Sequence, residues 1–226
     1  MSVSYFCAVV SQILEIVKLN ITLEWRQRQS ILAVLLYVLT TTYLSYLVFN
    51  GIISSETWNA LYWIILIFAA VQAAFRSFQN EADRRFLLYY SLVPPRVLVI
   101  GKTIYNFFYL LVIGLVTFAL FLFLLGNIVA DPLAFVVLVV LASAGFACIL
   151  TFVSGIAAKA GDNPALPAIL SIPLLYPQVL ALSRTSIRAL TGFSWSVNGP
   201  VLLVLLLLAL VSLLLSYLLF AYLWRD

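Results

Sequence analysis

The chain contains no histidine, and it has only two cysteines and one methionine among its 226 residues. Histidine is the commonest ligand of zinc and haem iron and the commonest general base, so its absence disfavours metal binding and acid–base catalysis. Cys7 lies near the start and Cys148 inside an apolar run, so they form neither a CxxC pair nor a disulfide framework, and we interpret both as small apolar residues. The composition predicts no catalytic residue, no metal site and no tightly bound cofactor, and the chain is not expected to be an enzyme.

Charged residues are also scarce, at 9% of the chain, while hydrophobic residues make up 65%. These values lie far outside the range of soluble globular domains. Six membrane spans of about 20 residues each would take about 120 residues, which leaves no room for a separate soluble catalytic domain. The formal net charge is +4, and in a membrane protein basic residues first indicate which loops are cytoplasmic. Nucleic acid is therefore not expected as a partner. We predict an all-α polytopic membrane protein in which residues 1–226 form a single transmembrane domain.

Six apolar runs predict six transmembrane helices, at about residues 31–49, 58–75, 103–125, 133–157, 164–182 and 201–223. The fifth run contains Pro167, Pro173 and Pro177. Because proline removes a backbone donor inside a helix, this span is expected to be kinked or broken. The polar stretch at 183–198 that follows is interpreted as an external loop or re-entrant segment.

Ahead of the first span, residues 11–28 predict an amphipathic helix. Apolar side chains, among them Trp25, recur at helical spacing, and charged ones such as Glu24, Arg26 and Arg28 lie between them. We expect this helix to lie at the cytoplasmic membrane interface. The alternative is that the segment is only a flank of the first span with an accidental periodicity.

Basic residues indicate the orientation of the predicted spans. With six spans, ten Lys and Arg residues fall on one side and only Arg184 and Arg188 on the other. Because cytoplasmic loops carry the excess of Lys and Arg, both chain ends and the connection at 76–102 are placed in the cytoplasm. Four tryptophans near the span ends are expected at headgroup level: Trp58, Trp63, Trp195 and Trp224.

Ionisable residues are absent from the predicted spans, which argues against a proton- or sodium-driven pump. The polar residues within the spans are neutral, and we expect most of them to form interhelical hydrogen bonds, with contact to a cargo as the alternative. They include Thr40 to Thr42, Gln72, Asn106, Ser154, Ser171 and Gln178. Small residues four apart permit close helix contacts within the chain or between subunits: Ala69 and Ala73, Ala70 and Ala74, Ser143 and Ala147, Ser154 and Ala158.

Gly101, Lys102 and Thr103 match the end of the phosphate-binding loop G-x-x-x-x-G-K-[ST]. The match fails because Arg96 stands where the first glycine is needed and because the segment leads straight into a membrane span. If ATP drives this protein, we therefore expect another subunit to bind it.

The connection at 76–102 is the most informative stretch outside the spans. It combines charged residues with an apolar and aromatic run, whereas an ordinary intracellular loop is polar throughout. Such a segment suits docking of a soluble partner, with aromatic anchors in a groove and charges that set the register. The alternative is an interfacial helix whose arginines snorkel and contact no protein. The predicted docking residues are Glu81, Asp83, Arg84, Arg85, Phe86, Tyr89 and Tyr90.

In its order of elements the chain resembles the permeases of exporter-type (ABC-2-like) ABC transporters. More closely, it resembles the haem exporter protein B family (CcmB), the permease-like subunit of the cytochrome c maturation transporter. The resemblance covers about residues 23–182. It is carried by Leu23-Glu24-Trp25-Arg26, Phe78-Gln79-Asn80-Glu81, the run from Leu87 to Pro95, Gly101-Lys102, and Ile172-Pro173-Leu174-Leu175-Tyr176-Pro177.

The resemblance implies a subunit of the bacterial cytoplasmic (inner) membrane that acts with a separate ABC ATPase subunit and other membrane subunits of cytochrome c maturation. It also implies haem as the cargo, or ATP-driven release of a haem-loaded chaperone. Strong iron ligation is not expected, because the chain has no histidine and few sulfur ligands. Two other functions fit the same architecture: an exporter-type permease for a lipid or drug, and a membrane scaffold that recruits partners without transport.

Overall fold

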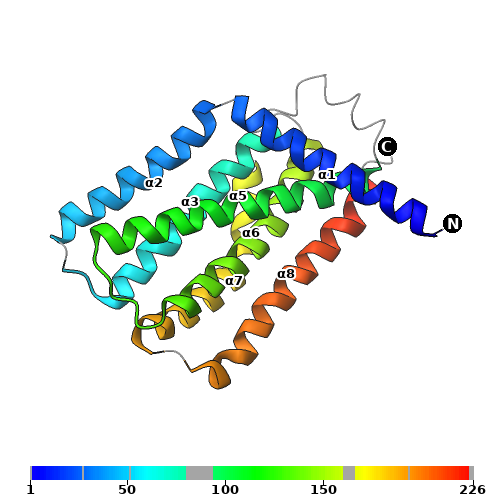
Figure 1. The fold of residues 1–226 in the computed structure, drawn as a ribbon. Helices are drawn as coiled ribbons and strands as arrows, with labels where there is room; N and C mark the ends of the chain where they lie inside the picture. Colours follow the sequence, from blue (N-terminus) through cyan, green and yellow to red (C-terminus); the bar gives the residue numbers. More distant parts are fainter. Residues whose placement is uncertain are drawn as a thin grey trace.

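A computed structural model describes residues 2–26, 28–50, 52–79, 94–159, 166–192 and 194–223. This part of the chain consists of helices joined by short connections, as Figure 1 shows. The helices are α1 (Ser2–Arg26), α2 (Arg28–Phe49), α3 (Ser55–Gln79), α5 (Pro95–Leu124), α6 (Pro132–Lys159), α7 (Leu166–Thr191) and α8 (Trp195–Leu223). The prediction of an all-α protein is confirmed for the described residues.

Among the described residues, four stretches are long and apolar enough to cross a membrane: Ile31–Phe49 in α2, Arg96–Leu124 in α5, Pro132–Val153 in α6 and Trp195–Leu218 in α8. They overlap the first, third, fourth and sixth predicted spans. The helices that overlap the second and fifth predicted spans, α3 and α7, are not among these four. By length and composition the chain is therefore a helical membrane protein.

Successive helices from α5 to α8 run in alternating directions. The loop between α5 and α6 lies against the C-terminal end of α7, where the Ala130 amide donates to the Leu190 carbonyl at 3.2 Å. At the opposite end of the bundle, the Arg96 guanidinium near the start of α5 lies 5.1 Å from the ring centroid of Tyr217 near the end of α8. α1 lies across this second end in Figure 1 and packs on α5. We call it the α1 end and the opposite one the far end.

α6 is the central helix of the bundle. It packs on α5, α7, α8 and α3, and 67% of its most apolar stretch is buried, against 11% for α8. Small residues permit the close approach, because Ser143, Gly145 and Ala147 are all buried on α6. Ala69 and Ala70 are buried on α3 as well. At these four predicted small-residue positions, Ala69, Ala70, Ser143 and Ala147, the residues therefore serve packing within the chain.

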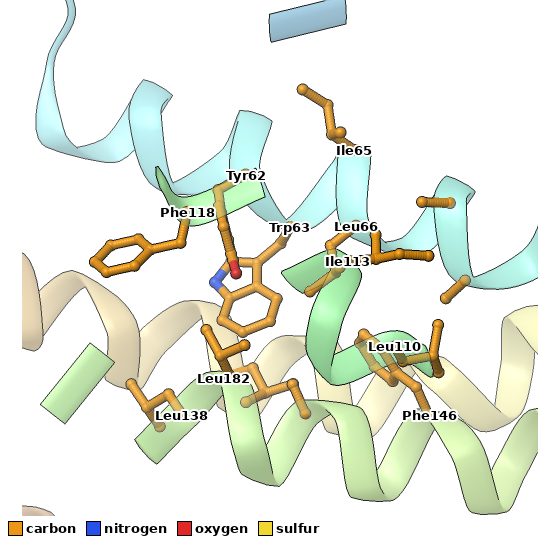
Figure 2. Packing of buried hydrophobic residues seen from close by; sticks show 14 of the residues in the cluster. Tyr62, Trp63, Ile65, Leu66, Leu110, Ile113, Phe118, Leu138, Phe146 and Leu182 are labelled. Carbon is orange, nitrogen blue, oxygen red and sulfur yellow. The ribbon is translucent and has the colours of Figure 1, made fainter. Parts of the chain in front are cut away.

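Six aromatic side chains form one buried cluster between α3, α5 and α6, which we call the aromatic cluster: Trp58, Tyr62, Trp63, Phe118, Phe121 and Phe135. Phe118 and Phe135 stack with ring centroids 4.7 Å apart, and Trp58 meets Phe121 edge to face at 5.1 Å. Figure 2 shows part of this cluster beside its aliphatic neighbours. The rings of Trp58 and Trp63 fill the space between helices, and their predicted position at headgroup level stays a prediction.

The boundaries of the predicted connection at 76–102 are wrong. Residues 76–79 belong to α3, and α5 begins at Pro95, since proline suits the first turn of a helix. The residues between the two helices are therefore 80–94. Lys102 lies inside α5 with its side chain only 3% exposed, whereas the sequence predicts it at the end of the cytoplasmic connection.

α7 and α8 absorb most of the predicted external segment at 183–198. α7 continues to Thr191, because the hydroxyls of Thr185 and Ser186 donate to carbonyls of their own helix, which lets polar residues remain in a buried helix. Gly192, at φ 136°, follows the helix end, and α8 starts at Trp195. The interpretation as a loop is wrong for 183–191 and for 195–198, which are helical, and the re-entrant alternative stays a prediction.

α7 also runs as one helix through Pro173 and Pro177. Pro167 lies in its first turn, where the missing amide would have no partner in any case. The two internal prolines lack amide donors, so the carbonyls of Ile169 and Pro173 receive no bond from the residue four positions on. Of the two expected alternatives, the break is wrong because the helix is continuous, and the kink stays a prediction. The helix carries two gaps in its backbone hydrogen-bond ladder.

Candidate functional site

α1 covers the α1 end of the bundle. It runs from Ser2 to Arg26, so it begins earlier than the predicted helix at 11–28, and Arg28 is the first residue of α2. An apolar strip lies exposed on one face of α1, at Val10, Leu14, Ile21 and Trp25. A helix with one face on a bundle and an apolar strip outside suits a membrane interface.

The contact between α1 and α5 depends on a glycine of α5 and includes a tyrosine of α5 that lies near a glutamate of α1. A Cβ added at Gly101 would lie 2.8 Å from Cγ2 of Ile16, so the helices approach closely because position 101 has no side chain. One turn further along α5, the Tyr105 hydroxyl lies near the Glu24 carboxylate of α1. Residues 101–103 are the interior of a packed helix, which confirms that this segment is not a phosphate-binding loop.

Gly101→Ala is expected to lower the free energy of unfolding by about 1–3 kcal/mol, because the new methyl group must displace Ile16 and with it α1. Thermal unfolding in detergent measures the loss, and tryptic cleavage after the exposed Lys18 should become faster. Gly199→Ala is the matched control, since a Cβ at that helical position meets nothing within 4 Å. Adding Ile16→Ala should restore most of the stability, and an unchanged Gly101→Ala protein would show that this glycine does not set the contact.

The neutral polar residues predicted within the spans divide into two groups. The Asn106 amide on α5 donates to the Thr151 hydroxyl on α6 at 2.8 Å, in a buried position. The Thr42 hydroxyl instead donates to the Val38 carbonyl of its own helix at 2.7 Å. The expectation of an interhelical bond is confirmed for Asn106 and wrong for Thr42, whose donor is used locally.

A buried polar cluster joins α3 to α7 towards the far end. We call it the clasp, and it consists of Asn59, Trp63, Ser183 and Ser186. The Asn59 amide donates to the Ser183 carbonyl at 2.9 Å, and the Asn59 oxygen accepts from the Ser186 hydroxyl at 2.6 Å. The Trp63 indole donates to Asn59 at 3.0 Å and to Ser186 at 2.8 Å. A network satisfied in this way holds two helices rigidly in one register.

Sequence reasoning missed the clasp for an identifiable reason. Asn59 falls at the end of a predicted span, and both serines fall in the stretch interpreted as an external segment. The available signal was the continuation of helical spacing from Leu182 through Ser186 to Ala189 and Leu190, all of which are buried on α7.

Gln178 on α7 differs from the clasp residues. Its side chain is 1% exposed, and within the described part of the chain neither polar atom of its carboxamide has a hydrogen-bond partner. It lies against Gly145 of α6, where an added Cβ would fall 1.6 Å from the carboxamide nitrogen. Only glycine leaves this notch open, so the pairing of Gln178 with Gly145 is specific.

The predicted docking residues lie outside the described residues: Glu81, Asp83, Arg84, Arg85, Phe86, Tyr89 and Tyr90. The helices on either side of them are described, and α3 ends at Gln79 while α5 starts at Pro95. Both helix ends lie at the α1 end, because α3 starts towards the far end near the clasp and α5 starts beside Tyr217. The docking role of the segment between them stays a prediction.

The chain matches no protein-family model, no curated protein and no solved structure. Within the described ranges, no group of three or more His, Cys, Asp or Glu residues could hold a metal ion. The helical membrane fold is therefore inferred from the structure and the apolar helices of this chain. The resemblance to the haem exporter family stays a prediction.

Proposed function

We propose that the chain is the membrane-spanning subunit of an ABC-type transporter complex, driven by ATP hydrolysis in a separate subunit. In this proposal α2, α3 and α5 to α8 cross the membrane, and α1 lies on the cytoplasmic surface, with both chain ends in the cytoplasm. The observation that carries it is the arrangement at the α1 end, where a crosswise helix packs on α5 beside the two helix ends that the charged connection joins. A partner bound there can move α3 and α5 together.

The distribution of charge supports this orientation. Cytoplasmic ends of membrane helices carry more Lys and Arg than external ends. The described helices have Lys18, Arg26, Arg96 and Lys102 towards the α1 end, against Arg184 and Arg188 towards the far end.

The packing suggests a route for force through the bundle. Closure of two ATPase subunits would push on the segment from Glu81 to Tyr90 and so on the adjoining ends of α3 and α5. α1 would follow α5 through the contacts at Gly101 and Tyr105. Because packed helices move as bodies and do not deform continuously, the spans would tilt towards an outward-facing state, with central α6 passing the motion to α7 and α8.

The proposed cargo process is haem delivery, or release of a haem-loaded chaperone, during cytochrome c maturation in the bacterial inner membrane. This part rests on the resemblance carried by residues such as Leu23 to Arg26 and Ile172 to Pro177. Haem would be held by apolar and aromatic contact and not by strong iron ligation, since the chain has no histidine. Partners would include an ABC ATPase subunit and other cytochrome c maturation subunits, with the haem chaperone engaged indirectly.

Arg84→Glu combined with Arg85→Glu is expected to reduce co-purification of an ABC ATPase by at least about tenfold, because reversed charges repel the partner surface they now face. The intact protein, extracted in mild detergent, should bring the ATPase and cytochrome c maturation subunits with it, as identified by mass spectrometry. Arg84→Lys with Arg85→Lys is the matched control, because it keeps both charges in place. Arg184→Glu reverses a charge at the far end and should also leave recovery unchanged.

Each outcome of this experiment decides something. Full recovery of the ATPase with the charge-reversed variant would show that docking does not use these arginines. An ATPase recovered without cytochrome c maturation subunits would favour a permease for a lipid or drug. No ATPase with the intact protein, under conditions that preserve membrane complexes, would overturn the transporter proposal in favour of a scaffold.

A further inference from the structure

At the contact between α6 and α7, two residues each cost free energy in the closed packing. Burying the Gln178 carboxamide with no hydrogen-bond partner among the described residues costs free energy that an apolar side chain of similar size would not cost. Gly145 costs free energy as well, because glycine is a poor residue inside a helix. A contact that never opens would be more stable with a methionine on α7 and an alanine on a slightly more distant α6. This pairing therefore suits a contact that opens.

α7 is fixed firmly on one side of Gln178. Towards its C-terminus the clasp holds it to α3, the Ala130 amide bonds the Leu190 carbonyl, and Arg188 donates to the Asn198 oxygen at 2.5 Å. These bonds reach three separate neighbours: α3, the loop before α6, and α8. The C-terminal part of α7 is therefore anchored to the body of the bundle.

The N-terminal part of α7 has a different environment. It is packed on one face only. Ser171 and Leu175 are buried, whereas the large side chains of Ile169, Ile172 and Tyr176 are exposed. Its two backbone gaps, at Pro173 and Pro177, come directly before Gln178. A helix bends most easily where its hydrogen-bond ladder is interrupted, so this turn is where the N-terminal part of α7 can move relative to the anchored part.

We infer that residues 166–177 of α7 form a gate that swings away from α6 about the proline-containing turn, with Gln178 in the Gly145 notch as its latch. Opening gives the carboxamide a polar partner, either water or a hydrogen-bonding group on a ligand, which offsets the packing that is lost. Closing returns it to the notch. The inference concerns this chain alone and goes beyond the proposed function, under which the gate would open towards the cytoplasm.

The test uses Leu175→Cys as a reporter, because Leu175 is buried on α7 one turn before the latch. The full-length protein, in lipid nanodiscs and carrying Cys7→Ser and Cys148→Ala, is treated with a membrane-impermeant methanethiosulfonate. Measurable modification is expected. Gln178→Met should slow it at least about tenfold, because methionine fills the notch without an unsatisfied amide and so favours the closed gate.

A second variant acts on the hinge instead of the latch. Pro173→Ala with Pro177→Ala restores both amide donors, stiffens α7 and should likewise slow modification of the reporter. Pro167→Ala is the matched control, because a first-turn proline interrupts no bond, and it should leave the rate unchanged. No modification of the parent, or one rate shared by all variants, would overturn the gate. Since the assay needs neither ATP nor a partner, its result is independent of whether an ATPase co-purifies.

Discussion

Phe135→Ala is expected to lower the free energy of unfolding by about 3–5 kcal/mol, the range for aromatic truncation in a packed core. The ring centroid of Phe135 lies 4.7 Å from that of Phe118, 5.0 Å from Tyr62 and 5.4 Å from Trp58. In a membrane, lipid tails are as apolar as the side chains, so helices associate through packing more than through the hydrophobic effect. Removal of the ring at the centre of the aromatic cluster therefore removes a main source of cohesion between α3, α5 and α6.

Phe123→Ala provides the matched control on α5. Its side chain is 85% exposed, so its removal should change stability by less than about 0.5 kcal/mol. Unfolding can be followed through the buried thiol of Cys148, which reacts with a thiol-sensitive fluorophore only as the bundle opens, in protein carrying Cys7→Ser. Equal losses for the two phenylalanine variants would show that the aromatic cluster does not hold the helices together.

The sequence predicts the helices well because their cause is local. An apolar run of about 20 residues can satisfy its backbone groups in lipid only as a helix, whatever its neighbours are. The described part of each of the six runs accordingly overlaps one helix, and residues 11–26 of the amphipathic stretch lie within α1. Where a helix ends is less local. α7 continues past Leu182 because Asn59 of α3 accepts a hydrogen bond from Ser186 of α7. The sequence of α7 alone does not reveal this partner.

The contacts between helices could not be predicted for a related reason. Trp58 and Trp63 are tryptophans near a predicted span end, which is typical of residues at headgroup level. Only the packing of α3 against α5 and α6 decides that they are buried. Gln178 stands out as a polar residue in an apolar run, but its pairing with Gly145 depends on the register of α6 against α7. The sequence of a single chain does not reveal how α6 is aligned along α7, because positions four residues apart on each helix lie on the same face and offer similar contacts.

Gly145→Ala is expected to lower the free energy of unfolding by about 3 kcal/mol, at the upper end of the usual cost of overpacking. The added carbon would fall 1.6 Å from the carboxamide nitrogen of Gln178 and 2.3 Å from its carbon, so the side chain must leave the notch or α7 must move away. Both responses separate α6 from α7. The loss should appear as a lower thermal midpoint and, with the Leu175→Cys reporter, as faster modification.

Gln178→Ala decides whether this clash is the cause. In the double variant with Gly145→Ala, the new methyl group occupies the space that the carboxamide leaves, so stability should return to within about 1 kcal/mol of the parent. The two substitutions would then show a coupling of about 2 kcal/mol, as residues in direct contact do. Gln178→Ala alone should change little, because the packing that it loses is offset by removal of an unsatisfied buried amide. If the double variant stayed as unstable as Gly145→Ala, another neighbour would constrain position 145, and the notch would have no part in holding α7 closed.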